Sequence, residues 1–171
     1  MFEGDYTIYG KHATYIKYLK EAKIFSRYID VYMAGAVLGA LYEKRASQTD
    51  SSDRARIYAD AFDTEHARCN EIFKIVILSD TLKSWSAEDR INICFRYRDR
   101  MDEMAVPPGT QNELDIMKEA KKLFDEYVLG GIELLYDCFS GNAAMDTEGI
   151  VDCAYKTLFD QHDLIENQEE D

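Results

Sequence analysis

The chain has 171 residues, of which 46% are hydrophobic and 31% charged, and its formal net charge is −13. A globular domain of this length buries about 70% of the surface of its unfolded chain, so it folds without disulfide or metal staples. The longest apolar run, residues 31–42, falls short of the about 20 residues that a membrane-spanning helix needs. The N-terminus also lacks the apolar segment of a secretion signal. Composition therefore excludes a membrane protein, and we expect a cytoplasmic one.

Four cysteines lie 15 to 44 residues apart, at Cys69, Cys94, Cys138 and Cys153, and none belongs to a Cys-x-x-Cys motif. This spacing fits neither a zinc site nor a small secreted disulfide scaffold. Each cysteine falls among apolar residues of a predicted helix. We therefore expect buried free thiols in a reducing compartment.

Helix-breaking residues are rare, because the only two prolines are the adjacent Pro107 and Pro108. Ala, Leu, Glu and Lys, which favour helices, are frequent. We therefore predict an all-α fold, a single-domain bundle of about six helices. The first two span about 10–21 and about 24–45, and the apolar run within the second predicts a buried core helix.

Two glycines, Gly35 and Gly39, lie one turn apart on one face of the second predicted helix. Each costs about 1 kcal/mol relative to alanine in a helix interior. Close backbone approach by a neighbouring helix would compensate for that cost. The sequence thus predicts a helix-packing role for this pair rather than a ligand site.

The third predicted helix spans about 54–79, with Asp53 as its expected N-cap. The fourth spans about 86–101. It begins with Ser86 and, three residues on, Asp89, which together resemble a capping box.

The clearest break in the chain is the Pro-Pro-Gly motif within residues 102–111. Neither side of the break has enough apolar stripes for a core of its own, so residues 1–165 are predicted to form one helical domain. The fifth helix spans about 112–139 and the sixth about 147–165. Residues 166–171 are expected to be an acidic, frayed C-terminus.

A second pair of glycines, Gly130 and Gly131, lies inside the long fifth helix. Adjacent glycines are a recognised cause of helix kinks. We count this pair with Gly35 and Gly39 as candidate helix-packing residues.

Charge is distributed unevenly along the chain. Residues 1–56 carry +2 and residues 57–100 carry −1, whereas residues 101–171 hold four Lys or Arg against eighteen Asp or Glu. Such asymmetry indicates an electrostatic preference in partners rather than a fold. We expect the acidic C-terminal portion to dock on a protein that is basic or bound to nucleic acid.

The three histidines, His12, His66 and His162, fall on three different predicted helices. A di-iron bundle needs two Glu-x-x-His pairs and two further Glu. The nearest approach here is Asp63-x-x-His66, which occurs once. The sequence therefore predicts no metal site, and His66 is interpreted as a hydrogen-bonded histidine of the core or its boundary.

Local signatures of catalysis are missing from the sequence. It contains no Gly-x-Ser-x-Gly, no His-Glu-x-x-His and no cysteine in a catalytic signature. The glycines lie inside helices or alone in turns, whereas a phosphate cradle needs a Gly-rich loop at a helix start. We therefore predict no catalytic residues and no cofactor, in a protein that is not an enzyme.

Two basic groups are candidate contacts for nucleic acid or for a protein partner. They are Lys44, Arg45, Arg54 and Arg56 around the first polar loop, and Arg90, Arg96, Arg98 and Arg100 on the fourth helix. Phosphate binding is driven by Lys and Arg whatever the base sequence. Acidic neighbours crowd the second group, however, and the net charge repels DNA at long range. The alternative interpretation is a solvated face paired with local acids.

Two stretches together resemble a known group of proteins. Residues 28–39, YIDVYMAGAVLG, followed by Lys44 and Arg45, resemble a helix of small bacterial proteins found with DNA phosphorothioation systems, the dnd system-associated protein 4 type. Residues 123–135, LFDEYVLGGIELL, are similar to a later helix of that group, which runs roughly Phe-Glu-Glu-Tyr-Ala-Asn-Gly-Gly.

Tyr127, Gly130 and Gly131 match the later pattern in order, whereas Val128 and Leu129 replace a small residue and Asn. The two stretches cover about 25 of 171 residues. The resemblance implies an accessory role in a complex for defence against phage, and it brings no catalytic residues with it.

Three functions follow as hypotheses. The first is a non-catalytic accessory or adaptor subunit of a bacterial defence or DNA-modification complex, which acts by protein contact. The second is a nucleic-acid-binding helical module that uses the fourth-helix arginines. The third is an acidic, phage-encoded inhibitor or DNA mimic. Homo-oligomer formation and direct contact with nucleic acid stay open at this point.

Overall fold

The computed structural model describes residues 4–49, 52–97 and 111–140, and helices account for 69% of these residues. The predicted all-α class is confirmed, with a small two-stranded sheet added. The elements in chain order are β1 (Tyr6–Tyr9), α1 (Lys11–Glu21), α2 (Tyr28–Leu41), β2 (Arg54–Ile57), α3 (Ala59–Thr64), α4 (His66–Ser79), α5 (Ala87–Phe95) and α6 (Gln111–Ser140).

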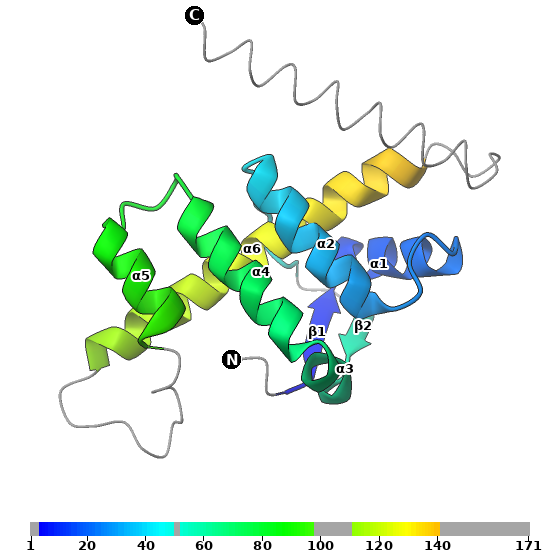
Figure 1. Ribbon diagram of the computed structural model, residues 1–171. Coiled ribbons are helices and arrows are strands. Elements are labelled where there is room, and N and C mark those ends of the chain that lie inside the picture. The colour runs from blue at the N-terminus through cyan, green and yellow to red at the C-terminus, as the bar shows by residue number, and fades with distance from the viewer. Residues whose placement is uncertain (1–3, 50–51, 98–110, 141–171) are drawn as a thin grey trace, which may run out of the picture.

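The long helix α6 lies at the centre of the fold. It packs against α1, α2, α4 and α5. Figure 1 shows α2 and α4 side by side in front of α6, with α5 near its N-terminal end and α1 beside its C-terminal half. No helix in the described residues is long and apolar enough to cross a membrane.

Close approach of backbones defines the crossing of α2 and α6. A Cβ added to Gly39 would clash with the carbonyl oxygen of Tyr127, and one added to Gly131 would clash with that of Gly35. The neighbouring Gly130 meets the carbonyl of Lys44 in the same way. The close approach expected at Gly35 and Gly39 is therefore present, and α6 continues through the double glycine.

An aromatic cluster fills the space between the sheet and four of the helices. Tyr32 of α2 lies at its centre, with ring centroids 5.2 Å from Tyr6 of β1, 5.4 Å from Phe62 of α3 and 5.9 Å from Phe124 of α6. Phe73 of α4 contacts Phe124 at 5.4 Å. Each buried ring removes about 150–250 Å² from water, so this cluster joins the sheet to the helices.

The start of the predicted third helix is wrong, because residues 54–57 form β2. Their sequence, Arg-Ala-Arg-Ile, alternates between exposed and buried side chains, which is the period of a strand. β2 pairs antiparallel with β1, with Tyr6 opposite Ile57 and Tyr9 opposite Arg54. The predicted range 54–79 extended the helical period of the following residues backwards over this strand.

Asp53 consequently caps no helix. Its carboxylate accepts a hydrogen bond from Thr14 Oγ1 at 2.8 Å and forms an ion pair with Lys17, both on α1. The remainder of the predicted helix is also divided, because α3 ends before Glu65 and α4 begins after it. One predicted helix is therefore a strand and two helices.

The second predicted helix is shorter than expected at both ends. At its C-terminal end, Glu43 has a positive φ angle of 49°, a left-handed conformation that ends helices. At its N-terminal end, α2 begins only at Tyr28, because Arg27 before it has an extended backbone. The capping box of Ser86 and Asp89 is confirmed at the start of α5. Three predicted features lie outside the described residues. They are the helix 147–165, the acidic end 166–171, and residues 102–110 of the predicted break.

Cys69 and Cys94 are buried free thiols, as expected, and Cys138 is also buried. Burial raises the pKa of Cys69 and of Cys94 to about 11. Both thiols are therefore protonated and unreactive at neutral pH. The fourth cysteine, Cys153, lies outside the described residues.

Candidate functional site

The first predicted basic group is divided between two parts of the fold. Lys44 and Arg45 follow α2 and face acids of α6: Lys44 Nζ lies 3.7 Å from Glu133 and Arg45 lies 3.9 Å from Glu126. Arg54 and Arg56 are exposed on β2, where Arg56 lies 3.6 Å from Asp5. The four side chains do not form one surface, and three of them face local carboxylates.

In the second predicted group, the side chain of Arg90 is largely covered by the fold, with 13% of it exposed. Its guanidinium donates to the carbonyl oxygens of Ile77 and Lys83, both at 2.8 Å, and lies 3.5 Å from the buried carboxylate of Asp80. Asp80 also accepts a 2.5 Å hydrogen bond from the hydroxyl of Tyr127 on α6. Arg90 therefore joins α4, α5 and α6 rather than facing a ligand.

Arg96, just after α5, donates to the side chain of Asn92 at 2.8 Å and stays at the surface. Arg98 and Arg100 lie outside the described residues. Arg96 is therefore the one member of the predicted fourth-helix cluster that lies at the surface within the described part of the chain.

The histidine prediction is partly wrong. His66 is exposed at the start of α4, where its ring hydrogen-bonds to Asn70. The buried histidine is His12, whose Nε2 lies 2.9 Å from Glu133 Oε1. Burial lowers the pKa of His12, against the opposing effect of Glu133. The sequence signal was present, because His12 stands four residues before Ile16 on the buried stripe of α1.

No group of three His, Cys, Asp or Glu side chains in the described part of the chain could hold a metal ion. His162 lies outside that part.

An apolar groove lies between α2 and α4, which run side by side in the same direction (Figure 1). Its volume is about 500 Å³. It is lined by Met33, Ala34, Val37 and Leu38 of α2 and by Arg68, Glu71 and Ile72 of α4. We call it the α2–α4 groove.

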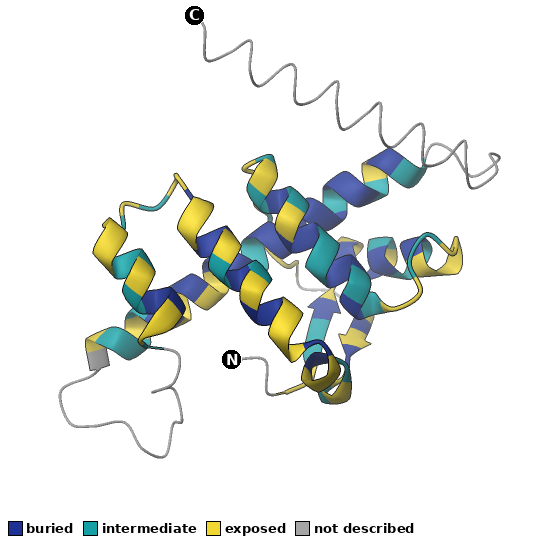
Figure 2. Ribbon diagram, in the orientation of Figure 1, coloured by how far each residue is buried: buried dark blue, intermediate teal, exposed yellow. Residues whose placement is uncertain are grey.

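Exposed apolar side chains continue the groove toward the C-terminal ends of both helices. Val37 is 42% exposed, Leu41 57% and Ile75 of α4 59%. Figure 2 shows such exposed residues on α2 and α4, whereas the middle of α6 behind them is buried. The prediction that the apolar run 31–42 is entirely buried is therefore wrong for one face of α2.

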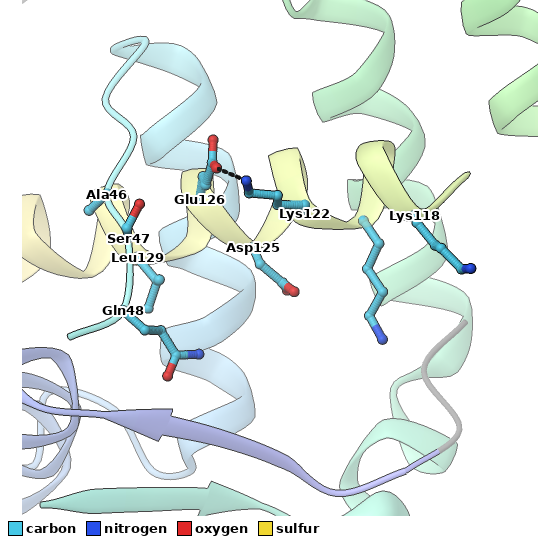
Figure 3. Close-up of a pocket in the computed structure, with 9 residues that line it drawn as sticks. Ala46, Ser47, Gln48, Lys118, Lys122, Asp125, Glu126 and Leu129 are labelled. Carbon is cyan, nitrogen blue, oxygen red and sulfur yellow. Dashed lines mark ion pairs between the residues drawn. The ribbon is translucent and has the colours of Figure 1, made fainter. Parts of the chain in front are cut away.

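A second cavity, of about 330 Å³, lies between α6 and the connection that follows α2. We call it the lysine pocket. Its lining residues are Ala46, Ser47 and Gln48 of the connection and Lys118, Lys121, Lys122, Asp125, Glu126 and Leu129 of α6. In Figure 3, Asp125 and Gln48 point into the same open space beside α6.

The connection is fixed in place on both sides of the lysine pocket. The amide of Ala46 donates to the carbonyl of Glu126 on α6 at 3.0 Å. The side chain of Gln48 bonds to the backbone of β1, to Thr7 at 3.3 Å and to Tyr9 at 3.1 Å. Because α6 and β1 both hold the connection, the shape of the pocket is set by the fold.

Asp125 is largely withdrawn from solvent at one end of the pocket. Burial raises the pKa of Asp125 to about 6, and the positive charge of Lys121 opposes that rise. The hydroxyl of Tyr32 donates to Asp125 Oδ1 at 3.3 Å. Burial is the main cause that raises the pKa of Tyr6, and the negative charge of Asp125 is the second. The hydroxyl of Tyr6 is itself buried, and no group in the described residues meets the distance and angle limits of a hydrogen bond to it.

Sequence reasoning missed the lysine pocket, although a signal for it existed. Residues 101–171 contain only four Lys or Arg, and three of these are Lys118, Lys121 and Lys122. A cationic group inside the most acidic part of a chain is unusual enough to mark a site. Treating that portion as uniformly acidic concealed it.

The residues that carry the resemblance to dnd system-associated proteins meet at one place. Gly35 and Gly39 of the first stretch pack against Tyr127 and Gly131 of the second, at the crossing of α2 and α6. In this chain the two stretches therefore form one helix crossing. Comparison of the whole chain with known protein families, with characterised proteins and with solved structures finds no match.

Proposed function

We propose that this protein is a non-catalytic contact subunit, and that its partner inserts an amphipathic helix into the α2–α4 groove. The observation that carries the proposal is the exposed apolar face of α2. Asp30 is the only charged residue between Tyr28 and Leu41, yet α6 covers only one side of this helix. A helix that is apolar on all sides is normally buried on all sides.

The groove has the form that a partner helix requires. Two parallel helices form its walls, and apolar side chains that line it recur one turn apart, as with Met33 and Val37. Amphipathic helices bind such grooves through anchors spaced by three, four and seven residues. Contiguous exposed apolar surface on a soluble protein marks an interaction site in many structures.

Charged residues on the α4 side of the groove favour a partner helix with both signs of charge. The side chains of Arg68 and Glu71 are 72% and 65% exposed and lie one turn apart. Their ion pairs are local, with Glu65 and Lys74 respectively. Each pair joins one exposed side chain to a largely covered partner, Glu65 at 10% exposure and Lys74 at 20%, so Arg68 and Glu71 remain accessible to a binding helix.

The wider setting of the proposal is a bacterial complex for defence against phage or for DNA modification, as the resemblance implies. There the strongly acidic C-terminal portion would attract a basic or nucleic-acid-bound partner at long range, and the groove would provide the specific contact. Long-range attraction acts mainly on the association rate, whereas the buried contact controls dissociation.

Copurification tests the proposal. The full chain is used as bait at low and high salt, in parallel with Val37→Glu and with Ile91→Glu as a matched control. Ile91 lies on α5, outside the groove, and is 46% exposed. We expect wild type and Ile91→Glu to retain the same partner and Val37→Glu to lose it. Retention by Val37→Glu, or no specific partner on wild type at low salt, would contradict the proposal.

A further inference from the structure

The lysine pocket has features of a small-molecule site, and it is independent of the α2–α4 groove. Three cations lie within about two turns of α6 in a chain whose net charge is −13. At 0.1 M salt, charges farther away than about 10 Å are largely screened. An anion in the pocket therefore experiences mainly the charges of the lining, which are three lysines against the carboxylates of Asp125 and Glu126.

The lysines differ in how far they are already engaged. Lys118 lies 3.9 Å from Asp115 and Lys122 lies 3.9 Å from Glu126, both at long ion-pair distances. Among the described residues, Lys121 has no ion pair within 4 Å, although its charge acts on Asp125. Lys121 is thus the group best placed to bind an anion directly.

The other end of the pocket offers a hydrogen-bond acceptor. Asp125 follows Lys121 by four residues, one turn along α6, and its side chain points into the cavity (Figure 3). Its surroundings supply the hydroxyl of Tyr32 as a donor at 3.3 Å, and the hydroxyl of Tyr6 also lies close enough to lower the pKa of Asp125. A further donor, such as a ligand N–H, would compensate for the solvent that the carboxylate has lost.

The dimensions limit the ligand. Lys121 and Asp125 are four residues apart, which is about 6 Å along a helix axis. Ala46 and Leu129 provide an apolar wall, and a cavity of about 330 Å³ is at the small end of ligand sites. We propose that the lysine pocket binds a small phosphate ester that carries an amine or amide N–H donor, with the phosphate on Lys121 and the N–H on Asp125.

A titration of the full chain, followed by backbone amide chemical shifts, tests this inference. The probes are adenosine monophosphate, which has both groups, ribose 5-phosphate, which lacks the N–H donors, and adenosine, which lacks the phosphate. We expect adenosine monophosphate to shift amides of residues 46–48 and 118–129. Ribose 5-phosphate and adenosine each lack one hydrogen bond to a charged group. Each should therefore bind at least about tenfold more weakly than adenosine monophosphate.

Variants identify the two ends. Lys121→Ala should weaken binding of adenosine monophosphate by about tenfold, whereas Lys20→Ala, an exposed lysine of α1, should leave it unchanged. Asp125→Asn should weaken adenosine monophosphate but not ribose 5-phosphate. No shift with adenosine monophosphate, shifts outside the pocket, or equal loss in the two lysine variants would overturn the inference.

Discussion

The two faces of α2 differ in what covers them, although both are apolar. The inner face carries Gly35 and Gly39 and packs so closely on α6 that no side chain fits between the backbones. The outer face carries Val37 and Leu41, which remain 42% and 57% exposed. The fold therefore explains the apolar residues of the inner face. Those of the outer face are covered only in part, which is why we propose that they serve binding.

The largest expected effect comes from filling the inner face. Gly131→Ala places a methyl group against the carbonyl of Gly35, so α2 and α6 must separate. Overpacking of a core costs about 1–3 kcal/mol, and we expect about 3 kcal/mol here because rigid backbone is the obstacle. Urea unfolding measures the change.

The matched control for that prediction is Gly4→Ala, because an added Cβ at Gly4 meets nothing within 4 Å. It should change the free energy of unfolding by less than about 0.5 kcal/mol. Equal stability of the two variants would show that the crossing is looser than described.

The next effect concerns the anchoring of α6 to α4 and α5. Tyr127→Phe removes the hydroxyl that donates to the buried Asp80 at 2.5 Å. A hydrogen bond to a charged group contributes about 1.5–3 kcal/mol, so we expect a loss of about 2 kcal/mol in urea unfolding. Tyr58→Phe, at a 61% exposed residue, is the control and should be neutral. A neutral Tyr127→Phe would mean that Arg90 and the backbone amide of Lys83 satisfy Asp80 without it.

The pH dependence of stability tests the contact between Tyr32 on the inner face of α2 and Asp125 in the lysine pocket. The pKa of Asp125 is about 6 in the folded chain and 3.8 ordinarily, so the folded state holds the proton more strongly and stability falls as pH rises from about 4 to 6. A difference of about two units is worth at most about 3 kcal/mol. Partial exposure reduces this to about 1–2 kcal/mol.

The comparison with Asp125→Asn isolates that contribution. We expect the stability of wild type relative to the variant to decrease between pH 4 and about pH 7, as measured by urea unfolding at each pH. A difference that is constant with pH would show that the carboxyl is well solvated.

The smallest expected effect on stability is at the outer face. Val37→Glu replaces a side chain that is already 42% exposed, so its free energy of unfolding should change by about 0.5 kcal/mol or less. Thermal unfolding of the variant and wild type checks this. A loss as large as that of Gly131→Ala would place Val37 in the core instead of at a binding surface.

The sequence predicted the parts of the fold that depend on helical period and local caps. Helix α6 matches its predicted range within a residue at each end, and the Ser86 capping box is present. The close crossing could be predicted because glycine inside a helix needs a packing reason.

The remaining features depend on tertiary contacts, which local patterns do not contain. β2 is four residues long, too short for its alternation to outweigh the helical stripe that follows, and its partner β1 is more than forty residues away in the chain. Counting charges along the sequence likewise could not show that Arg90 contacts Asp80 and two backbone carbonyls. The groove and the lysine pocket appear only when α2, α4, α6 and the connection are assembled.

The outer face of α2 is proposed to serve binding and not folding. The most direct measurement is the dissociation constant of the copurified partner for wild type, Val37→Glu and Ile91→Glu, with unfolding measured on the same samples. We predict that Val37→Glu weakens binding by about a hundredfold or more, because a carboxylate would be buried without a partner, while Ile91→Glu and all three stabilities stay unchanged. Wild-type affinity in Val37→Glu would contradict the account.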